Sequence, residues 1–130
     1  MSALKEQAAE LLAAGERDLQ ALQLLNQTGQ APHEVIGFHA QQAAEKCIKA
    51  LLVLRGIFFE RTHDLVLLYR LAEQQGVSLA ADVEQLRALN SYAVQFRYES
   101  CRVALMSSQA CEEIAGRLHQ QVLNEFTKDD

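Results

Sequence analysis

Residues 39–54 place polar side chains at spacings that could serve binding or acid–base chemistry. At about 100° per residue, as in an α-helix, the polar and apolar residues of this stretch fall on opposite arcs. The polar arc consists of Gln41, Gln42, Glu45, Lys46 and Lys49, with His39 at its edge. Such a stripe could hold an anionic ligand. The favoured interpretation is a solvated helix face with a Glu45–Lys49 pair at the i,i+4 spacing.

A second candidate is an arginine on a predicted core face. In the helical pattern that begins at Asp82, Asn90 and Arg97 fall in the middle of an otherwise apolar arc. A buried guanidinium needs a carboxylate, a group of carbonyls or a ligand phosphate, because an unpaired buried charge is costly. Pairing with a carboxylate such as Glu45 and binding of a phosphate are equally open. Tyr98 could stack on a base, although a tyrosine at the edge of the core is commoner.

The other titratable residues indicate structural roles. His63 and Asp64 are adjacent, so their side chains diverge on a helix, and helix capping explains them better than an acid–base pair. The four histidines lack the spacing to cysteine, histidine or carboxylate that forms a metal site, so neither a metal nor a cofactor is expected. Cys47, Cys101 and Cys111 lie in helical patterns and are interpreted as buried, reduced thiols.

Charge and hydropathy restrict the class of partner. The 130-residue chain has a net charge of −5, which argues against general binding to duplex DNA or to an anionic membrane. Residues 35–70 hold five basic and three acidic residues and form the one basic segment, which points to a small anionic ligand near the polar stripe. No basic leader precedes an apolar stretch and no run of 18 apolar residues occurs, so a cytoplasmic protein is expected.

Helical periodicity organises the whole chain. Apolar spacings of three and four predict helices over about residues 3–26, 32–55 and 63–75, a fourth from Asp82 and a fifth over about 103–126. Thr62 is predicted to cap the third helix, and Gly56 and Gly76 to end the second and third. The fold class is therefore all-α: one domain over residues 1–130, an antiparallel up-and-down four-helix bundle with an additional short helix, and a frayed tail at 127–130.

Four segments together resemble a known family. They are Arg17-Asp18-Leu19, the run from Phe38 to Leu51 with its Gln-Ala-Ala-Glu-Lys sequence, Thr62-His63-Asp64-Leu65, and Tyr92 to Arg97-Tyr98. In this order they resemble the HEPN domain (higher eukaryotes and prokaryotes nucleotide-binding) over about residues 5–125. The resemblance implies a helical bundle that pairs as a homodimer. In small prokaryotic members it also implies a minimal nucleotidyltransferase as partner in a toxin–antitoxin module.

The resemblance also gives a sequence criterion for enzymatic activity. Many HEPN relatives are metal-independent RNases, in which four to six residues separate an arginine from a histidine, and the pair acts at the scissile phosphate of RNA. Arg97 matches that arginine. The three positions at which the histidine would lie hold Arg102, Val103 and Ala104 instead. The chain is more similar to a branch with an Arg-Tyr-Pro-Asp turn, although Glu99-Ser100 replaces Pro-Asp. His63 and Glu45 are the remaining candidates for a general base.

The leading hypothesis is a non-catalytic HEPN homodimer that binds a nucleotide, RNA or a partner nucleotidyltransferase. Its ligand-binding residues would be Arg97, Tyr98, Arg102, Lys46, Gln42, Glu45 and Lys49. One alternative is an RNA-cleaving toxin that uses Arg97 with a non-standard partner such as His63. Another is a purely structural subunit whose polar groove is filled by its own side chains. Tyr98 is a further candidate, as an acceptor of adenylyl groups from the partner, on the resemblance alone.

Dimerisation has weak support from the residues themselves. Four apolar side chains lie on the otherwise polar arc of the second predicted helix: Val35, Phe38, Leu52 and Val53. They could form a dimer surface, because a solvated face does not require so much apolar area. They could equally pack under the 56–61 loop, where Ile57, Phe58 and Phe59 need cover.

Overall fold

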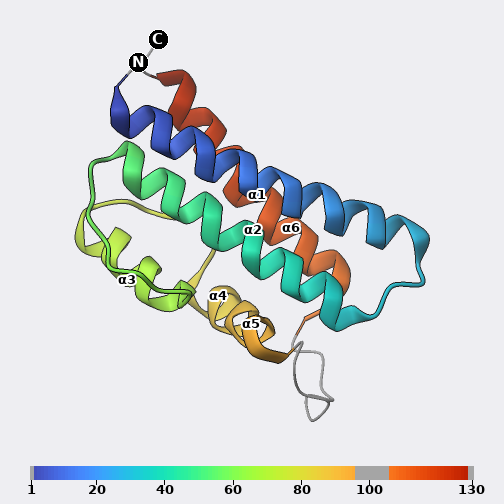
Figure 1. The fold of residues 1–130 in the computed structure, drawn as a ribbon. Helices are drawn as coiled ribbons and strands as arrows, with labels where there is room; N and C mark the ends of the chain where they lie inside the picture. The colour runs from blue at the N-terminus through green and yellow to red at the C-terminus, as the bar shows by residue number, and fades with distance from the viewer. Residues whose placement is uncertain (1, 96–105, 129–130) are drawn as a thin grey trace.

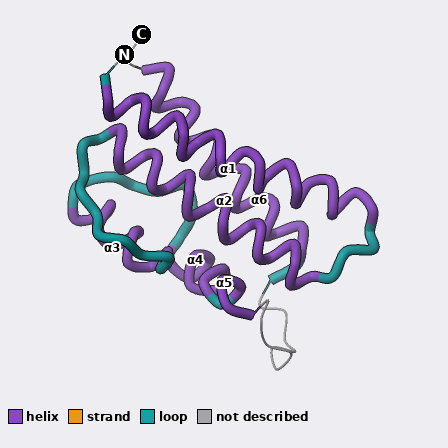
Figure 2. The backbone as a smooth tube through the Cα atoms, in the orientation of Figure 1, coloured by secondary structure: helices purple, strands orange, loops and turns teal. Residues whose placement is uncertain are grey.

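The computed structural model describes residues 2–95 and 106–128, and their regular structure is helical throughout, as Figure 2 shows. The elements are α1 (Ala3–Thr28), α2 (His33–Leu54), α3 (Leu65–Gln74), α4 (Val83–Asn90), α5 (Tyr92–Gln95) and α6 (Ser108–Lys128). The predicted all-α class is confirmed. Both ends of α6 differ from the prediction: it begins at Ser108 instead of about residue 103, and it continues through Thr127 and Lys128, which were assigned to the frayed tail.

The three long helices α1, α2 and α6 pack against one another along their lengths (Figure 1). The end of α1 meets the start of α6, where the Asn26 side chain donates to Glu112 at 2.7 Å. The end of α2 meets the end of α6, where Arg55 donates to Glu125. Therefore α6 runs antiparallel to α1 and parallel to α2.

The fourth position of the bundle is filled by the short helices α4 and α5, with α3 in the connection that precedes them (Figure 1). The segment before α4 lies near the end of α6, where the Ala80 N–H donates to Gln121 at 2.7 Å. Tyr92 of α5 lies against Gly37 near the start of α2. The chain thus returns along α2 in the direction that the up-and-down prediction requires.

The predicted fourth helix is not continuous, and this is a correction. α4 ends at Asn90, Ser91 separates it from α5, and the Ser91 hydroxyl donates to the Ala88 carbonyl at 2.8 Å. Serine competes with helical hydrogen bonds in this way. Asn90, the last residue of α4, uses its side chain for tertiary contacts: it accepts from the Leu65 N–H at 2.8 Å and donates to Asp64 at 2.7 Å.

The cap of α3 was also predicted at the wrong residue. Asp64 is the N-cap, and its carboxylate accepts from the N–H groups of Val66 and Leu67. The Thr62 hydroxyl instead accepts from the Asp64 N–H at 3.0 Å. Helix capping is therefore confirmed as the role of this segment, with aspartate in place of threonine.

Small residues allow close contacts around α2. An added Cβ on Gly15 of α1 would lie 3.2 Å from the Cys47 sulfur, and one on Gly37 would lie 2.3 Å from the Tyr92 ring. Cys47 and Cys111 are buried free thiols, as predicted, and Cys101 lies outside the described residues. Burial raises the pKa of Cys47 to about 12, with a further contribution from the Glu16 and Asp18 carboxylates, and burial raises that of Cys111 to about 11.

Candidate functional site

The polar stripe of α2 is not the solvated face that the sequence favoured. Gln41 is fully buried and Glu45 is only 4% exposed, because the segment that joins α2 to α3 passes over them. Two groups that need hydrogen bonds are therefore enclosed in the protein. A buried carboxylate requires partners that replace the lost water.

Those partners come from two directions. The Lys49 ammonium, one helical turn along α2, lies 3.0 Å from Glu45 Oε2. His63, in the connection before α3, places Nδ1 3.1 Å from both oxygens of Glu45. The carboxylate thus lies between a lysine and a histidine, of which the histidine comes from a different segment of the chain.

Gln41 contacts both Glu45 and the backbone of His63. Its side-chain amide donates to Glu45 Oε1 at 3.3 Å and to the His63 carbonyl at 3.1 Å, and its own oxygen accepts from Gln42 at 2.7 Å. Gln41 therefore orients the carboxylate and holds the backbone of the histidine that faces it. We call Gln41, Glu45, Lys49 and His63 the Glu45 cluster.

The Glu45 cluster has the geometry of an acid–base pair. The His63 side chain is 69% exposed, whereas that of Glu45 is 6% exposed. With Nδ1 directed at the carboxylate, Nε2 is the ring nitrogen left for a ligand or substrate. A carboxylate that orients an imidazole is a recurrent arrangement in general acid–base catalysis. The pair is His63 with Glu45, and Asp64 is occupied at the start of α3.

A second polar cluster joins α1 to α2. Asp18 accepts from Lys46 Nζ at 2.6 Å, and its other oxygen lies 3.0 Å from His39 Nδ1. Asp18 was not predicted as a partner of the polar stripe. The spacing indicates a shared partner, because His39 and Lys46 are seven residues apart and so lie on one face of a helix.

A groove of about 500 Å³ lies between α1, α2 and the segment that follows α2. Its basic lining residues are Lys46, Lys49 and Arg61, and Glu10 is its acidic one. Lys49 Nζ lies 5.9 Å from the centre of the Phe59 ring, which also lines the groove. Phe59 and Arg61 were not among the predicted ligand-binding residues, although Arg61 belongs to the basic segment recognised in the sequence.

The structure brings together only part of the predicted site. Gln42, Glu45, Lys46 and Lys49 lie on α2 with the contacts given above, and His63 joins Glu45. Three predicted residues, Arg97, Tyr98 and Arg102, lie outside the described residues. Within residues 2–95 and 106–128, no group of three histidine, cysteine or acidic residues could hold a metal ion.

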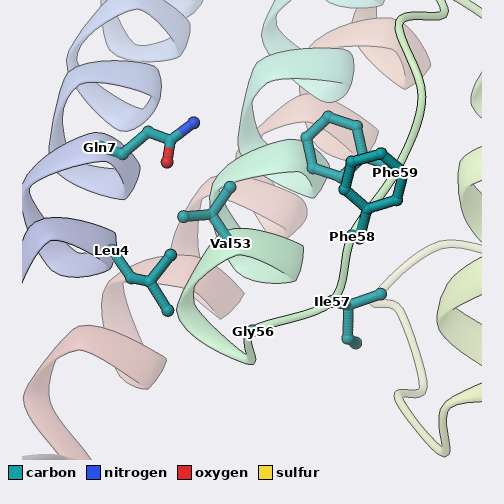
Figure 3. A pocket seen from close by; sticks show the side chains of 7 residues that line it. All are labelled: Leu4, Gln7, Val53, Gly56, Ile57, Phe58 and Phe59. Atoms are coloured by element: carbon teal, nitrogen blue, oxygen red, sulfur yellow. The ribbon is translucent and has the colours of Figure 1, made fainter.

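Two of the four apolar residues on the stripe are buried within this one chain, and two are not. Leu52 and Val53 are buried within this one chain, and Val53 shares a hollow of about 320 Å³ with Ile57, Phe58 and Phe59 (Figure 3). Val53 therefore lies at the 56–61 loop, as one alternative predicted. Val35 and Phe38 are half-buried.

Another contact that the sequence did not reveal joins α2, α5 and α6. His33 Nε2 lies 2.5 Å from the Tyr92 hydroxyl, and Nδ1 lies 2.8 Å from the Ser108 hydroxyl. Tyr92 is 1% exposed, so this histidine satisfies a buried phenol. We interpret the contact as structural, because both ring nitrogens are occupied.

The comparisons with known proteins agree with the resemblance found in the sequence. The model of the HEPN domain matches residues 8–124. The chain belongs to the HEPN family. A crystal structure described as that of ST0689, an archaeal HEPN homologue, superposes with a TM-score of 0.61, at 22% identity over 91% of this chain and 96% of the other. This likeness supports the HEPN fold.

A shorter match links this HEPN chain to a curated protein. It is 44% identical over 46 residues to the Methanocaldococcus jannaschii protein named "Putative toxin MJ1304". The matched segment is 35% of this chain and 29% of the relative. In the part of the chain that the structure describes, no helix has the length and apolarity needed to cross a membrane.

Proposed function

We propose that this HEPN protein is a non-catalytic component of a toxin–antitoxin-like module that binds a nucleotide or RNA and works with a minimal nucleotidyltransferase. The observation that carries this proposal is the groove beside the Glu45 cluster. Three basic side chains line it on a chain of net charge −5. Local positive charge on an acidic protein favours a small or single-stranded phosphate ligand over duplex DNA.

We place binding ahead of catalysis because most polar side chains of the α2 stripe already form ion pairs or hydrogen bonds with other residues of the chain. Lys46 is held by Asp18 and Lys49 by Glu45, so both ammonium groups are preorganised along one side of the groove. The arginine–histidine spacing of the RNase relatives is absent from this sequence. The name of the matched archaeal relative supports a place in a toxin–antitoxin-like module.

Titration of the purified protein with ATP and with a fluorescent single-stranded RNA tests the binding proposal. We expect saturable binding that weakens as salt rises, since phosphate contacts release counterions. Arg61→Met should weaken it, and Arg117→Met, an exposed cation on α6, should not. Absence of binding by the wild-type protein at millimolar ATP or oligonucleotide would overturn the proposal and favour a purely structural subunit.

RNA cleavage is a second candidate function, favoured by the His63–Glu45 contact. In such a reaction His63 would exchange protons with the RNA hydroxyl groups and Arg97 would neutralise the phosphate. Incubation with varied RNAs tests this directly. Loss of cleavage in both His63→Ala and Arg97→Ala would support the enzyme, and intact RNA with the wild-type protein would rule it out.

The partner and the oligomeric state belong to the same proposal. We expect a homodimer, which sedimentation would reveal as twice the chain mass, and a monomer at all concentrations would contradict it. Co-expression with a minimal nucleotidyltransferase, followed by intact mass measurement, tests Tyr98 as an adenylyl acceptor. An unmodified mass would remove Tyr98 from that role.

A further inference from the structure

The loop after α2 exposes an aromatic side chain that the protein does not use for packing. Phe58 is 81% exposed, whereas its neighbour Phe59 is half-buried. Phenylalanine is usually among the most buried residue types. A large aromatic held outside the core is a candidate contact for a ligand.

Phe58 lies at the apolar end of a longer surface groove. Figure 3 shows the hollow that it lines with Leu4 and Gln7 of α1 and Val53 of α2. Gln7 and Phe59 line both this hollow and the basic groove described above. The two depressions therefore adjoin, one apolar and aromatic, the other basic.

The basic end contains one cation that is still available. Arg61 is exposed and forms no ion pair with the residues that the structure describes, whereas Lys46 and Lys49 are paired with Asp18 and Glu45. A guanidinium offers paired donors that match a phosphate group. Arg61 is thus the groove residue that can bind an anion without breaking an existing contact.

We propose that the loop from Phe58 to Arg61 binds one nucleotide unit of a single-stranded RNA. Phe58 stacks on the base and Arg61 binds the adjoining phosphate, while the Gln7 amide faces the groove between them. An apolar ring and a cation in adjoining depressions match a nucleotide, because a base has an apolar face and its phosphate a negative charge. This inference rests on the proposed function and assigns its RNA contacts to a loop outside the Arg97 segment.

The absence of tryptophan from the chain makes a direct test possible. Phe58→Trp introduces a single fluorescent indole at the proposed stacking position. Its emission should be quenched on titration with a short single-stranded RNA, and binding should be retained. Leu67→Trp is the matched control, because Leu67 is also an exposed apolar residue, at 52%, but lies on α3. Its emission should not change.

Affinity measurements separate the two proposed contacts. Phe58→Ala should weaken RNA binding about tenfold, the usual scale for one stacked base. Arg61→Gln should weaken it and lower the slope of log affinity against log salt by about 0.7, as expected for one phosphate contact on a single strand. Arg70→Gln, an exposed arginine on α3, should leave both quantities unchanged.

The outcomes distinguish this inference from the proposed function. If the wild-type protein binds RNA and Phe58→Ala binds equally well, the loop assignment is wrong and the binding function stands. If the wild-type protein binds ATP but no RNA, this inference is wrong and the binding function stands. If it binds neither ATP nor RNA, both are wrong. If Phe58→Ala changes the oligomeric state in sedimentation without changing RNA affinity, the surface contacts a second copy of the chain, and the inference is overturned.

Discussion

The α2 helix is held in the bundle by two different kinds of contact. At Gly15–Cys47 and Gly37–Tyr92 the neighbouring elements approach closely because a side chain is missing. At the Glu45 cluster they approach through hydrogen bonds and opposite charges. The close contacts depend on shape. The Glu45 cluster depends on polar pairing, both between Gln41, Glu45 and Lys49 along α2 and with His63 from the connection before α3.

This difference indicates where function is to be sought. Close packing stabilises a fold without placing any reactive group at the surface. A buried carboxylate adds little net stability compared with apolar residues of similar size. The Glu45 cluster is therefore hard to explain by stability alone, and it orients an exposed imidazole beside a basic groove.

The largest expected effect tests the close contacts. Gly37→Ala should lower the free energy of unfolding by about 3 kcal/mol, because the new methyl group overlaps the Tyr92 ring. Gly116→Ala in α6 is the control, since nothing lies within 4 Å of its added Cβ, and it should raise stability by up to about 1 kcal/mol. Urea unfolding followed by circular dichroism measures both. Equal effects would show that steric contact with Tyr92 is unimportant.

A smaller effect is expected for the Glu45 cluster. Glu45→Ala should lower the free energy of unfolding by about 2 kcal/mol, since Gln41 loses an acceptor and Lys49 its counterion. His63→Ala should cost less than about 0.5 kcal/mol, because the imidazole is mostly exposed. A large loss of stability in His63→Ala would contradict the separation of its role from folding.

The hydrogen bonds from Asn90 to the start of α3 add a third contact to this comparison. Asn90→Ala should cost about 1.5 kcal/mol, because it removes the acceptor for the Leu65 N–H and the donor to Asp64. Burial tends to raise the pKa of Asp64, but hydrogen bonds from Asn90, Leu67 and Val66 and the charge of Arg87 lower it overall. The carboxylate therefore stabilises the fold above its ordinary pKa of 3.8, and this contribution is lost as pH falls through the lower folded value.

Acid unfolding provides the readout for that shift. The Asn90→Ala variant should lose less stability than the wild-type protein as the pH is lowered from above the ordinary aspartate pKa of 3.8 to below it. An identical pH dependence in the two proteins would show that Asn90 does not set the pKa of Asp64.

The smallest effect is expected where α1 and α2 meet at the surface. Lys46→Met should change the free energy of unfolding by about 0.5 kcal/mol or less, because its pair with Asp18 is partly exposed. The effect should shrink further in 1 M salt, which screens exposed charges. A loss above 2 kcal/mol that persists in salt would place this pair with the Glu45 cluster.

The sequence predictions were accurate where the structure depends on neighbouring residues. They failed where residues distant in the sequence are in contact. The helices over α1, α2 and α6 were predicted to within a few residues, apart from the start of α6, because periodicity is a local property of the chain. The break at Ser91 was missed, and so were the side-chain contacts of Asn90 to Asp64 and Leu65, which lie 26 and 25 residues earlier. Glu45 was placed on a solvated face for the same reason, since its cover comes from the connection to α3.

The amino-acid sequence by itself determined the helical class, the basic segment of residues 35–70 and the HEPN resemblance. All three depend on residue types and short spacings. Tertiary structure decided which polar residues are buried, which carboxylate faces each histidine, and that Phe59 and Arg61 share a groove with Lys49. A helical wheel gives the direction of a side chain but not the segment that lies opposite. The chemistry of this protein depends on that opposing segment.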